Sequence, residues 1–116
     1  MITEDYISYN SAVLLQKKGF KGDYHAWYNK FAPSEVEFNN SIIPDNFIPA
    51  PTLQMAMKWV NEEHGIYIEI RRNLNVYTFK YLIQNNGKLV SYSDWMYTTH
   101  EEACEVAIKY CLENLI

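Results

Sequence analysis

The stretch from Ala50 to Ile70, APTLQMAMKWVNEEHGIYIEI, constrains the fold of this chain more than any other part of it. Its first half carries apolar residues at the i, i+3, i+4 and i+7 spacing of an amphipathic helix: Leu53, Ala56, Met57 and Val60. Gly65 is typical of the left-handed residue that follows a helix, and Pro51 suits a first helical turn. Beyond Gly65 the apolar residues alternate as in a strand with one buried face: Ile66, Ile68 and Ile70. We therefore expect a helix over 52–64 that packs against the strand after it.

Two further helices are predicted near the ends of the chain. A short helix over 9–18 follows Ser8, a favourable N-cap residue, and stops at a glycine. A second helix over 100–113 follows Thr99, and Glu102 stands three residues after it, which is the spacing of a capping box. The buried face of this second helix is predicted from its apolar and small residues: Ala103, Cys104, Ala107, Ile108 and Cys111.

Residues 66–97 predict a meander of three antiparallel strands, over 66–72, 76–84 and 88–97. Asn86–Gly87 is a strong signal for a two-residue hairpin turn. If Arg71 pairs with Val76, alternation adds four residues to the inner face with the isoleucines: Tyr77, Phe79, Tyr81 and Ile83. The two-residue turn then carries three residues of the third strand inward: Val90, Tyr92 and Asp94. A carboxylate does not suit that side, so we expect a bulge or a strand end near Asp94.

These elements predict one α+β domain over 1–116. Its antiparallel sheet has three or four strands, and the helices 52–64 and 100–113 pack on one face of it. Residues 21–50 give a weaker pattern, but alternation near Tyr24–Asn29 and Glu35–Phe38 predicts at least one strand there, which completes the sheet. The apolar, proline-bearing stretch from Ile42 to Ala50 is expected to run extended along the core or a partner.

Composition excludes several classes of protein. The formal charge of −4 disfavours a general electrostatic grip on nucleic acid or on an anionic membrane, although it leaves room for a local basic patch. No run of about 18 apolar residues is present, so no membrane span is predicted. The opening MITEDYISYN is acidic rather than apolar, which favours a cytoplasmic setting over secretion. Aromatic residues make up 16% of the chain, a surplus that fits either the rim of a core or a binding surface.

Residues with catalytic chemistry do not form a recognisable motif. Glu62, Glu63 and His64 are adjacent, so they do not share a helix face, and the metal-binding H-E-x-x-H spacing is missing. Cys104 and Cys111 lie two helical turns apart, about 10 Å, which is too far for a disulfide. The chain also has no nucleophile elbow and no phosphate-binding glycine loop. We therefore predict no enzyme, no cofactor and no metal site.

Three segments carry a resemblance to known proteins: ISYNSAVLLQKKGF, APTLQMAMKWVNEEHGIYIEI and TTHEEACEVAIKYCLENLI. They resemble a family of small uncharacterised proteins from gut Bacteroidetes and their phages or mobile elements. Such proteins share an opening helix that ends in KGF, an APT-initiated helix with KW, and a T-x-EEA helix at the C-terminus. The resemblance covers most of the chain except residues 21–48. It implies a bacterial or phage cytosolic setting, and it carries over no functional residues.

Three hypotheses for function follow. The first is a non-enzymatic protein-binding or self-associating module, with an aromatic partner surface: Trp27, Tyr28, Phe47 and Trp95. The second is weak single-stranded nucleic-acid binding through 66–97, where Tyr67, Trp95 and Tyr97 accompany four cations: Arg71, Arg72, Lys80 and Lys88. The third is a small enzyme that uses His25 or His64 as an acid–base group. The acidic chain favours ordinary solvent-facing charges over the second hypothesis.

Overall fold

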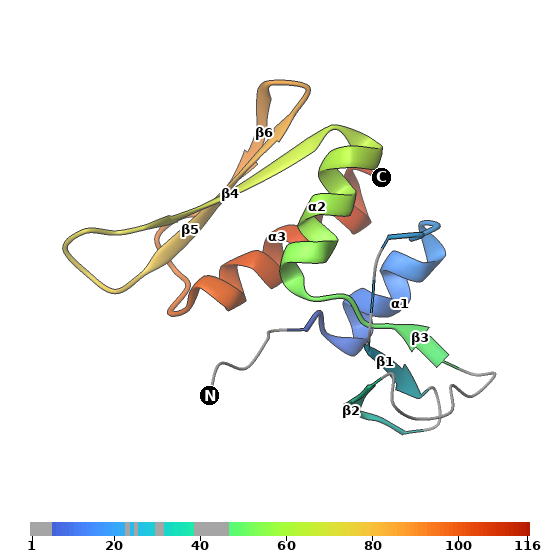
Figure 1. Cartoon of the computed structure of the whole chain (residues 1–116). Helices are drawn as coiled ribbons and strands as arrows, with labels where there is room; N and C mark the ends of the chain where they lie inside the picture. The colour runs from blue at the N-terminus through green and yellow to red at the C-terminus, as the bar shows by residue number, and fades with distance from the viewer. Residues whose placement is uncertain (1–5, 23, 25, 30–31, 39–46) are drawn as a thin grey trace.

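The computed structural model of the chain describes residues 6–22, 24, 26–29, 32–38 and 47–116 (Figure 1). Within these residues the chain forms three helices: α1 (Tyr9–Lys17), α2 (Leu53–His64) and α3 (His100–Asn114). It also forms six strands: β1 (Ala26–Asn29), β2 (Ala32–Phe38), β3 (Phe47–Pro49), β4 (Ile66–Arg72), β5 (Phe79–Asn85) and β6 (Lys88–Tyr92).

The larger sheet is the antiparallel meander β4–β5–β6, and α2 and α3 pack on one face of it (Figure 1). This covered side is its inner face, and its buried residues are Ile66, Ile68, Tyr81 and Ile83. The small residues of α3 let that helix approach the sheet closely, and four of its side chains meet the strands in one core: Ala103, Ala107, Ile108 and Cys111. The predicted α+β class and the predicted meander are confirmed.

The caps of α2 show why this helix begins and ends where it does. Thr52 accepts a hydrogen bond at its Oγ1 from the Met55 N–H at 3.2 Å, which satisfies one of the free donors of the first turn. Gly65 has φ +68°, so it supplies the left-handed residue that turns the chain into β4. A Cβ at Gly65 would also lie 2.8 Å from Asn86 Oδ1 of the β5–β6 turn. Glycine is therefore favoured here by its left-handed conformation, and a side chain would also require Asn86 to move.

The other helix caps follow the predicted residues with one difference. The Ser8 hydroxyl caps α1 by accepting from the Ser11 N–H, and Thr99 caps α3 by accepting from the Glu102 N–H at 3.0 Å. The Glu102 carboxylate accepts a hydrogen bond from the Thr98 hydroxyl. The threonine side chain therefore makes its capping-box hydrogen bond. The Glu102 side chain instead accepts from Thr98, the residue before the cap.

The register of β4 against β5 differs from the predicted one. Arg71 lies opposite Lys80 rather than Val76, so 73–78 form a longer connection, held by a 2.8 Å hydrogen bond from the Asn73 N–H to the Thr78 carbonyl. The shift is an even number of residues, so it leaves alternation intact, and Tyr81 and Ile83 face inward as predicted. Tyr77 falls in the connection and is exposed, so its predicted place on the inner face is wrong.

The third strand carries its bulge earlier than predicted. Gln84 lies opposite Leu89 and Ile83 lies opposite Ser91, so Val90 is the extra residue. The bulge reverses the alternation that follows it, and Tyr92 pairs with Leu82 on the outer face of the sheet. Val90 and Tyr92 are both exposed, so their predicted inward positions are wrong. Ser93 faces the inner side instead, where its Oγ accepts a hydrogen bond from the Tyr81 N–H.

The N-terminal part forms a second sheet of its own, in the order β2–β1–β3. The strands predicted in this region are present, but they do not extend the meander. The Tyr28 hydroxyl donates to the Ile7 carbonyl at 2.8 Å, and Ile48 of β3 is buried in the same core as the helices. The extended path predicted for Ile42–Ala50 is present at β3, and its first part lies outside the described residues.

The contact between α3 and the start of α1 ties the two sheets together. The Ser8 N–H donates to Glu105 Oε1 at 3.1 Å, and the Ser8 hydroxyl donates to the same oxygen. The carboxylate thus satisfies a donor at the N-terminus of α1, where the helix dipole also favours a negative charge. Among the described residues, Glu105 Oε2 and Ser11 Oγ of α1 are both buried without a hydrogen-bond partner.

Replacing Glu105 with alanine should lower the free energy of unfolding by about 1.5–3 kcal/mol, because two charge-assisted hydrogen bonds are lost. Urea unfolding followed by circular dichroism measures the change. Glu113→Ala is the matched control, since Glu113 is an exposed residue of the same helix and should change stability by about 0.5 kcal/mol or less. Equal effects of the two substitutions would contradict the proposed role of the Ser8 contact.

Candidate binding surface on the open sheet

The outer face of the meander is the side turned away from α2 and α3. Cross-strand pairing arranges its residues in three rows: Tyr67–Gln84–Leu89, Glu69–Leu82–Tyr92 and Arg71–Lys80. No described helix or strand covers these rows. The face is therefore a preformed surface whose composition is set by every second residue of the three strands.

Two tyrosines dominate the apolar part of this face. Tyr67 is 53% exposed on β4 and Tyr92 is 66% exposed on β6, with Leu82 between them on β5. Leu89 adds a further exposed apolar side chain in the first row. Aromatic side chains give large contact area at low entropic cost when they stand on a rigid element, so this surface suits binding.

Two cations occupy the third row of the outer face as direct cross-strand neighbours. Arg71 and Lys80 lie opposite each other, an arrangement of like charges that destabilises a sheet. The Glu69 carboxylate accepts a hydrogen bond from Arg71 Nε and raises the pKa of that guanidinium. Lys80 Nζ lies over the ring of Trp95, 4.4 Å from its centroid, which is a cation–π contact. Each cation therefore has one partner, and the Glu69 carboxylate offsets part of the repulsion between them.

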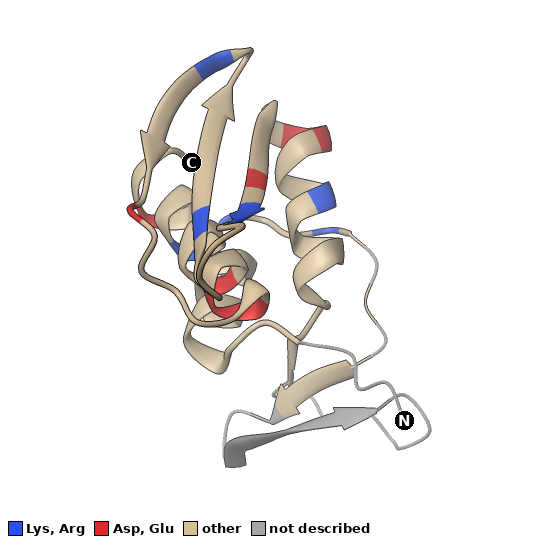
Figure 2. Cartoon of the chain, turned by 90° about the vertical axis from the view of Figure 1, so that its left-hand side faces the viewer, with Lys and Arg blue, Asp and Glu red and all other residues tan. Residues whose placement is uncertain are grey.

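Charge is unevenly divided along the chain. Residues 66–97 contain four basic and two acidic residues, a balance of +2, whereas the remaining residues contain six basic and twelve acidic ones, a balance of −6. Figure 2 shows this division in space, with basic positions along the strands of the meander and acidic positions concentrated on the helices. The meander is thus a locally basic surface on an acidic chain.

The meander has two edge strands, β4 and β6, and β6 exposes more apolar side chains. The far side of β6 pairs with no described strand, and three of its five residues are exposed apolar side chains: Leu89, Val90 and Tyr92. Natural proteins protect such an edge by covering it, by charges or proline, by keeping it short or by a β-bulge. Lys88 is the only charged residue of β6, and the strand is short and carries the bulge at Val90. A further strand could therefore pair with only part of this edge.

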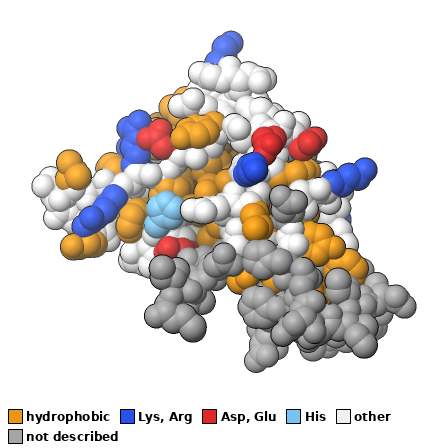
Figure 3. Space-filling view, viewed as in Figure 1, with side chains coloured by type: hydrophobic (Ala, Val, Ile, Leu, Met, Phe, Trp, Pro, Cys, Tyr) orange, Lys and Arg blue, Asp and Glu red, His pale blue; other side chains and the backbone are white. Residues whose placement is uncertain are grey.

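The connection between β4 and β5 is a second exposed apolar feature. Leu74 is 96% exposed, and Val76 and Tyr77 are also largely exposed. Figure 3 shows this connection projecting from the body of the molecule with hydrophobic and basic side chains. The Arg72 guanidinium lies over the Tyr77 ring at 4.3 Å. The connection over 73–78 projects outward and forms no groove. Apart from Arg72, no described residue covers its apolar side chains.

The aromatic residues predicted for a partner surface are mostly not at the surface. Trp27 is fully buried, and Tyr28 is buried with its hydroxyl bonded to the Ile7 carbonyl. Phe47 is half-buried, with its ring 6.2 Å from that of Tyr24. Trp95 alone of the four is exposed, and it lies beside the outer face through its contact with Lys80.

The four predicted nucleic-acid contacts divide into two groups. Arg71 and Lys80 share the outer face, whereas Arg72 and Lys88 stand at opposite ends of the meander. Tyr97, predicted to lie near these cations, is buried against the ring of Tyr81. Tyr92 was not among the predicted residues. The sequence held one indication of its outward position. The predicted register placed the Asp94 carboxylate on the inner face, which called for a bulge or a strand end but did not say where a bulge would lie.

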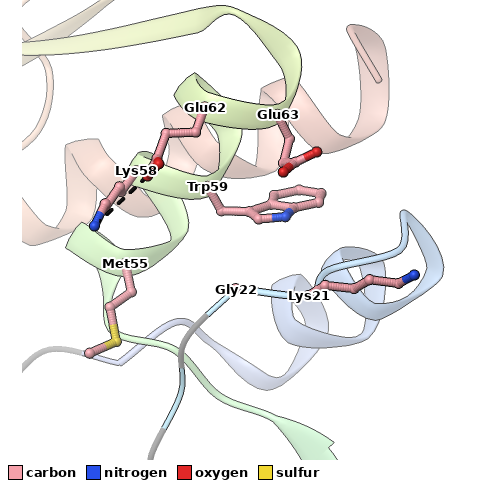
Figure 4. A pocket seen from close by; sticks show the side chains of 7 residues that line it. All are labelled: Lys21, Gly22, Met55, Lys58, Trp59, Glu62 and Glu63. Carbon is pink, nitrogen blue, oxygen red and sulfur yellow. Dashed lines mark ion pairs between the residues drawn. The ribbon is translucent and has the colours of Figure 1, made fainter.

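The region around Trp59 is a shallow depression of about 380 Å³ between α2 and the segment after α1 (Figure 4). Two lysines and two glutamates line it, and Lys58 pairs with Glu62 at 3.8 Å, so it has no net charge preference. The His64 ring packs edge-on against Trp59 with 4.9 Å between centroids. His64 Nε2 is buried without a hydrogen-bond partner among the described residues, and His25, the other histidine of the acid–base hypothesis, lies outside them.

The two cysteines are buried, as predicted, and burial raises the pKa of the Cys111 thiol to about 12. The Cys104 Sγ lies 3.5 Å from His100 Nδ1, one turn earlier on α3. A buried thiol offers no access to a substrate, so this pair is structural. In the part of the chain that the structure describes, no three potential metal ligands among the histidine, cysteine, aspartate and glutamate side chains are grouped as a metal site requires.

Comparison with known proteins adds no further assignment: no protein-family model, no curated protein and no solved structure matches the chain. Among the described residues, none of the helices has the length and apolar character needed to cross a membrane.

Proposed function

We propose that this chain is a non-enzymatic, self-associating protein module in which β6 of one copy adds to β6 of a second copy. The observation that carries the proposal is the exposed apolar edge of the meander, which pairs with no described strand: Leu89, Val90 and Tyr92. Strand addition satisfies the free backbone donors and acceptors of an edge and buries its apolar side chains. The pairing would join two three-stranded sheets into one continuous sheet.

Charge complementarity supports a second copy as the occupant. If two β6 strands pair antiparallel about a two-fold axis near Ser91, Lys88 of each copy lies opposite Asp94 of the other. Both residues are exposed and their side chains are available for this pair. Opposite charges across neighbouring strands stabilise pairing, and like charges oppose it. The edge is short, so the expected product is a reversible dimer rather than an obligate one.

Multi-angle light scattering and sedimentation equilibrium over a wide concentration range test this proposal. Wild-type protein should form a dimer as concentration rises, and Lys88→Glu or Asp94→Lys alone should weaken dimerisation by about tenfold or more, because each places like charges opposite each other. The double variant Lys88→Glu with Asp94→Lys should regain dimerisation. Lys109→Glu, an exposed charge change on α3, should leave it unchanged.

A monomer at every concentration would contradict self-association. A double variant as weak as the single variants would contradict the antiparallel pairing about Ser91. Far-ultraviolet circular dichroism of each variant separates loss of association from loss of folding.

A further inference from the structure

We propose that the outer face of the β4–β5–β6 sheet binds single-stranded nucleic acid, with Tyr67 and Tyr92 stacking bases and with Arg71 and Lys80 holding phosphates. The observation is the juxtaposition of two exposed tyrosine rings and two neighbouring cations on one uncovered sheet face. The Tyr92 side chain belongs both to this face and to the β6 edge, whereas Tyr67, Arg71 and Lys80 lie on the other two strands, so the proposal is made for the single copy and does not depend on self-association.

The bulge at Val90 creates the aromatic part of this face. Without it, Tyr92 would point to the inner face, and Tyr67 would be the only exposed tyrosine on the strands of the outer face. Bulges re-aim side chains near binding sites. The two tyrosines lie on the strands flanking β5, which are about 10 Å apart, and they stand in neighbouring rows, with Leu82 beside Tyr92 as an apolar floor. Flat, accessible rings on an open sheet are suited to stacking with bases of any sequence.

The two neighbouring cations of the outer face favour an anionic ligand. Arg71 and Lys80 are direct cross-strand partners, which is an unfavourable arrangement in the folded chain without a ligand. Glu69 offsets part of this repulsion through Arg71, whereas Lys80 lies over the Trp95 ring, which carries no charge. A phosphate between the two side chains would neutralise both charges, and the local balance of +2 over residues 66–97 would favour its approach.

The carboxylates of Glu69 and Asp94 repel phosphates, so they lower the affinity expected for nucleic acid. Glu69 already contacts Arg71, so a phosphate must compete with or displace this carboxylate. With two phosphate contacts, the slope of log K against log salt should be about −1.4 for a single strand. Weak, strongly salt-dependent binding is therefore the expected behaviour. An acidic peptide would satisfy the cations equally well, but it offers no flat ring to the exposed tyrosines, so the observations favour nucleic acid.

Fluorescence anisotropy with a labelled oligothymidylate of about twelve nucleotides, and with an RNA of mixed sequence and equal length, tests the proposal at about 20–200 mM salt. Wild-type protein should bind both probes at low salt and release them as salt rises. Tyr92→Ser and Tyr67→Ser should each weaken binding by about tenfold through loss of one stack. Lys80→Glu combined with Arg71→Glu should abolish binding.

Matched controls separate the outer face from general charge and aromaticity. Lys109→Glu changes an exposed cation on α3, and Tyr77→Ser removes an exposed tyrosine from the β4–β5 connection; neither should change affinity by more than about twofold. The charge-reversed dimer variants Lys88→Glu and Asp94→Lys serve a second purpose. Oligonucleotide binding that persists in the monomeric single variants would support this proposal even if self-association fails.

Three results would overturn the proposal. One is no oligonucleotide binding at the lowest salt by a wild-type protein whose circular dichroism is native. Another is binding of polyglutamate without binding of either oligonucleotide, which would assign the face to acidic polypeptides. The last is an equal loss of affinity in Lys109→Glu and in the Lys80 and Arg71 variant, which would assign binding to net charge alone.

Discussion

Replacing Ile83 with alanine is expected to lower the free energy of unfolding by about 2–5 kcal/mol, the largest effect of any single truncation in the meander. Ile83 is completely buried in the central strand and lies between Ile68 on β4 and Ser91 on β6. Its side chain faces α3, so truncation removes contacts on the side where the sheet and the helices share a core. The surrounding elements are fixed by backbone pairing, and they can close the resulting cavity only in part.

The matched control is Leu82→Ala, one residue away on the opposite face of the same strand. Leu82 is half-buried, so its truncation should cost about 1 kcal/mol or less. Urea unfolding of both variants, with tyrosine and tryptophan fluorescence as the probe, measures the difference. Equal losses would mean that both faces of the meander are covered in solution. That outcome would contradict the open outer face on which nucleic-acid binding depends.

The second large effect is expected at alkaline pH. Burial raises the pKa of the Cys111 thiol from its ordinary value of 9.0 to about 12. Below pH 9 the thiol is protonated in both the folded and the unfolded state, so the full stability is present. Between pH 9 and 12 the unfolded state ionises while the folded state resists ionisation, and stability falls by up to about 1.4 kcal/mol per pH unit. Tyr28, whose pKa is raised by burial and then by the Glu105 carboxylate, acts in the same direction.

Urea unfolding at about pH 8, 9, 10 and 11 checks this prediction, with the slope of stability against pH as the measured quantity. Cys111→Ala is the informative variant. It will lower stability at every pH because it leaves a small cavity, but it should flatten the slope above pH 9 because the titrating thiol is gone. A slope that is unchanged in Cys111→Ala would contradict the role assigned to this thiol.

Much of the architecture could be predicted because its signals are local. Ser8, Gly65 and Thr99 each act within one turn of their own helix, and the structure shows the predicted cap at all three. The Asn86–Gly87 turn is equally local: both residues have positive φ, as a tight hairpin between β5 and β6 requires. Periods of 3.6 and 2 then set which residues of α2 and β4 are buried.

The errors arose where the outcome depends on distant contacts. Two features depend on how the strands pack against the helices: the length of the β4–β5 connection and the position of the bulge in β6. Such packing cannot be predicted from the sequence of one segment alone. Trp27 and Tyr28 look like surface aromatics beside polar neighbours, yet both are buried, and Tyr28 contacts Ile7 and the Tyr9 ring far from it in the sequence. The candidate surface was therefore predicted only in part: its cations were named, and its second tyrosine was missed.

The contact between Glu105 and Ser8 also has a consequence for biosynthesis. Its two partners are separated by 97 positions, so the beginning of α1 is synthesised long before the carboxylate that completes it. Until α3 has been made, the N-terminal sheet and its helix lack the neighbour that joins them to the meander. We expect the nascent chain to acquire its final stability only once α3 has emerged from the ribosome.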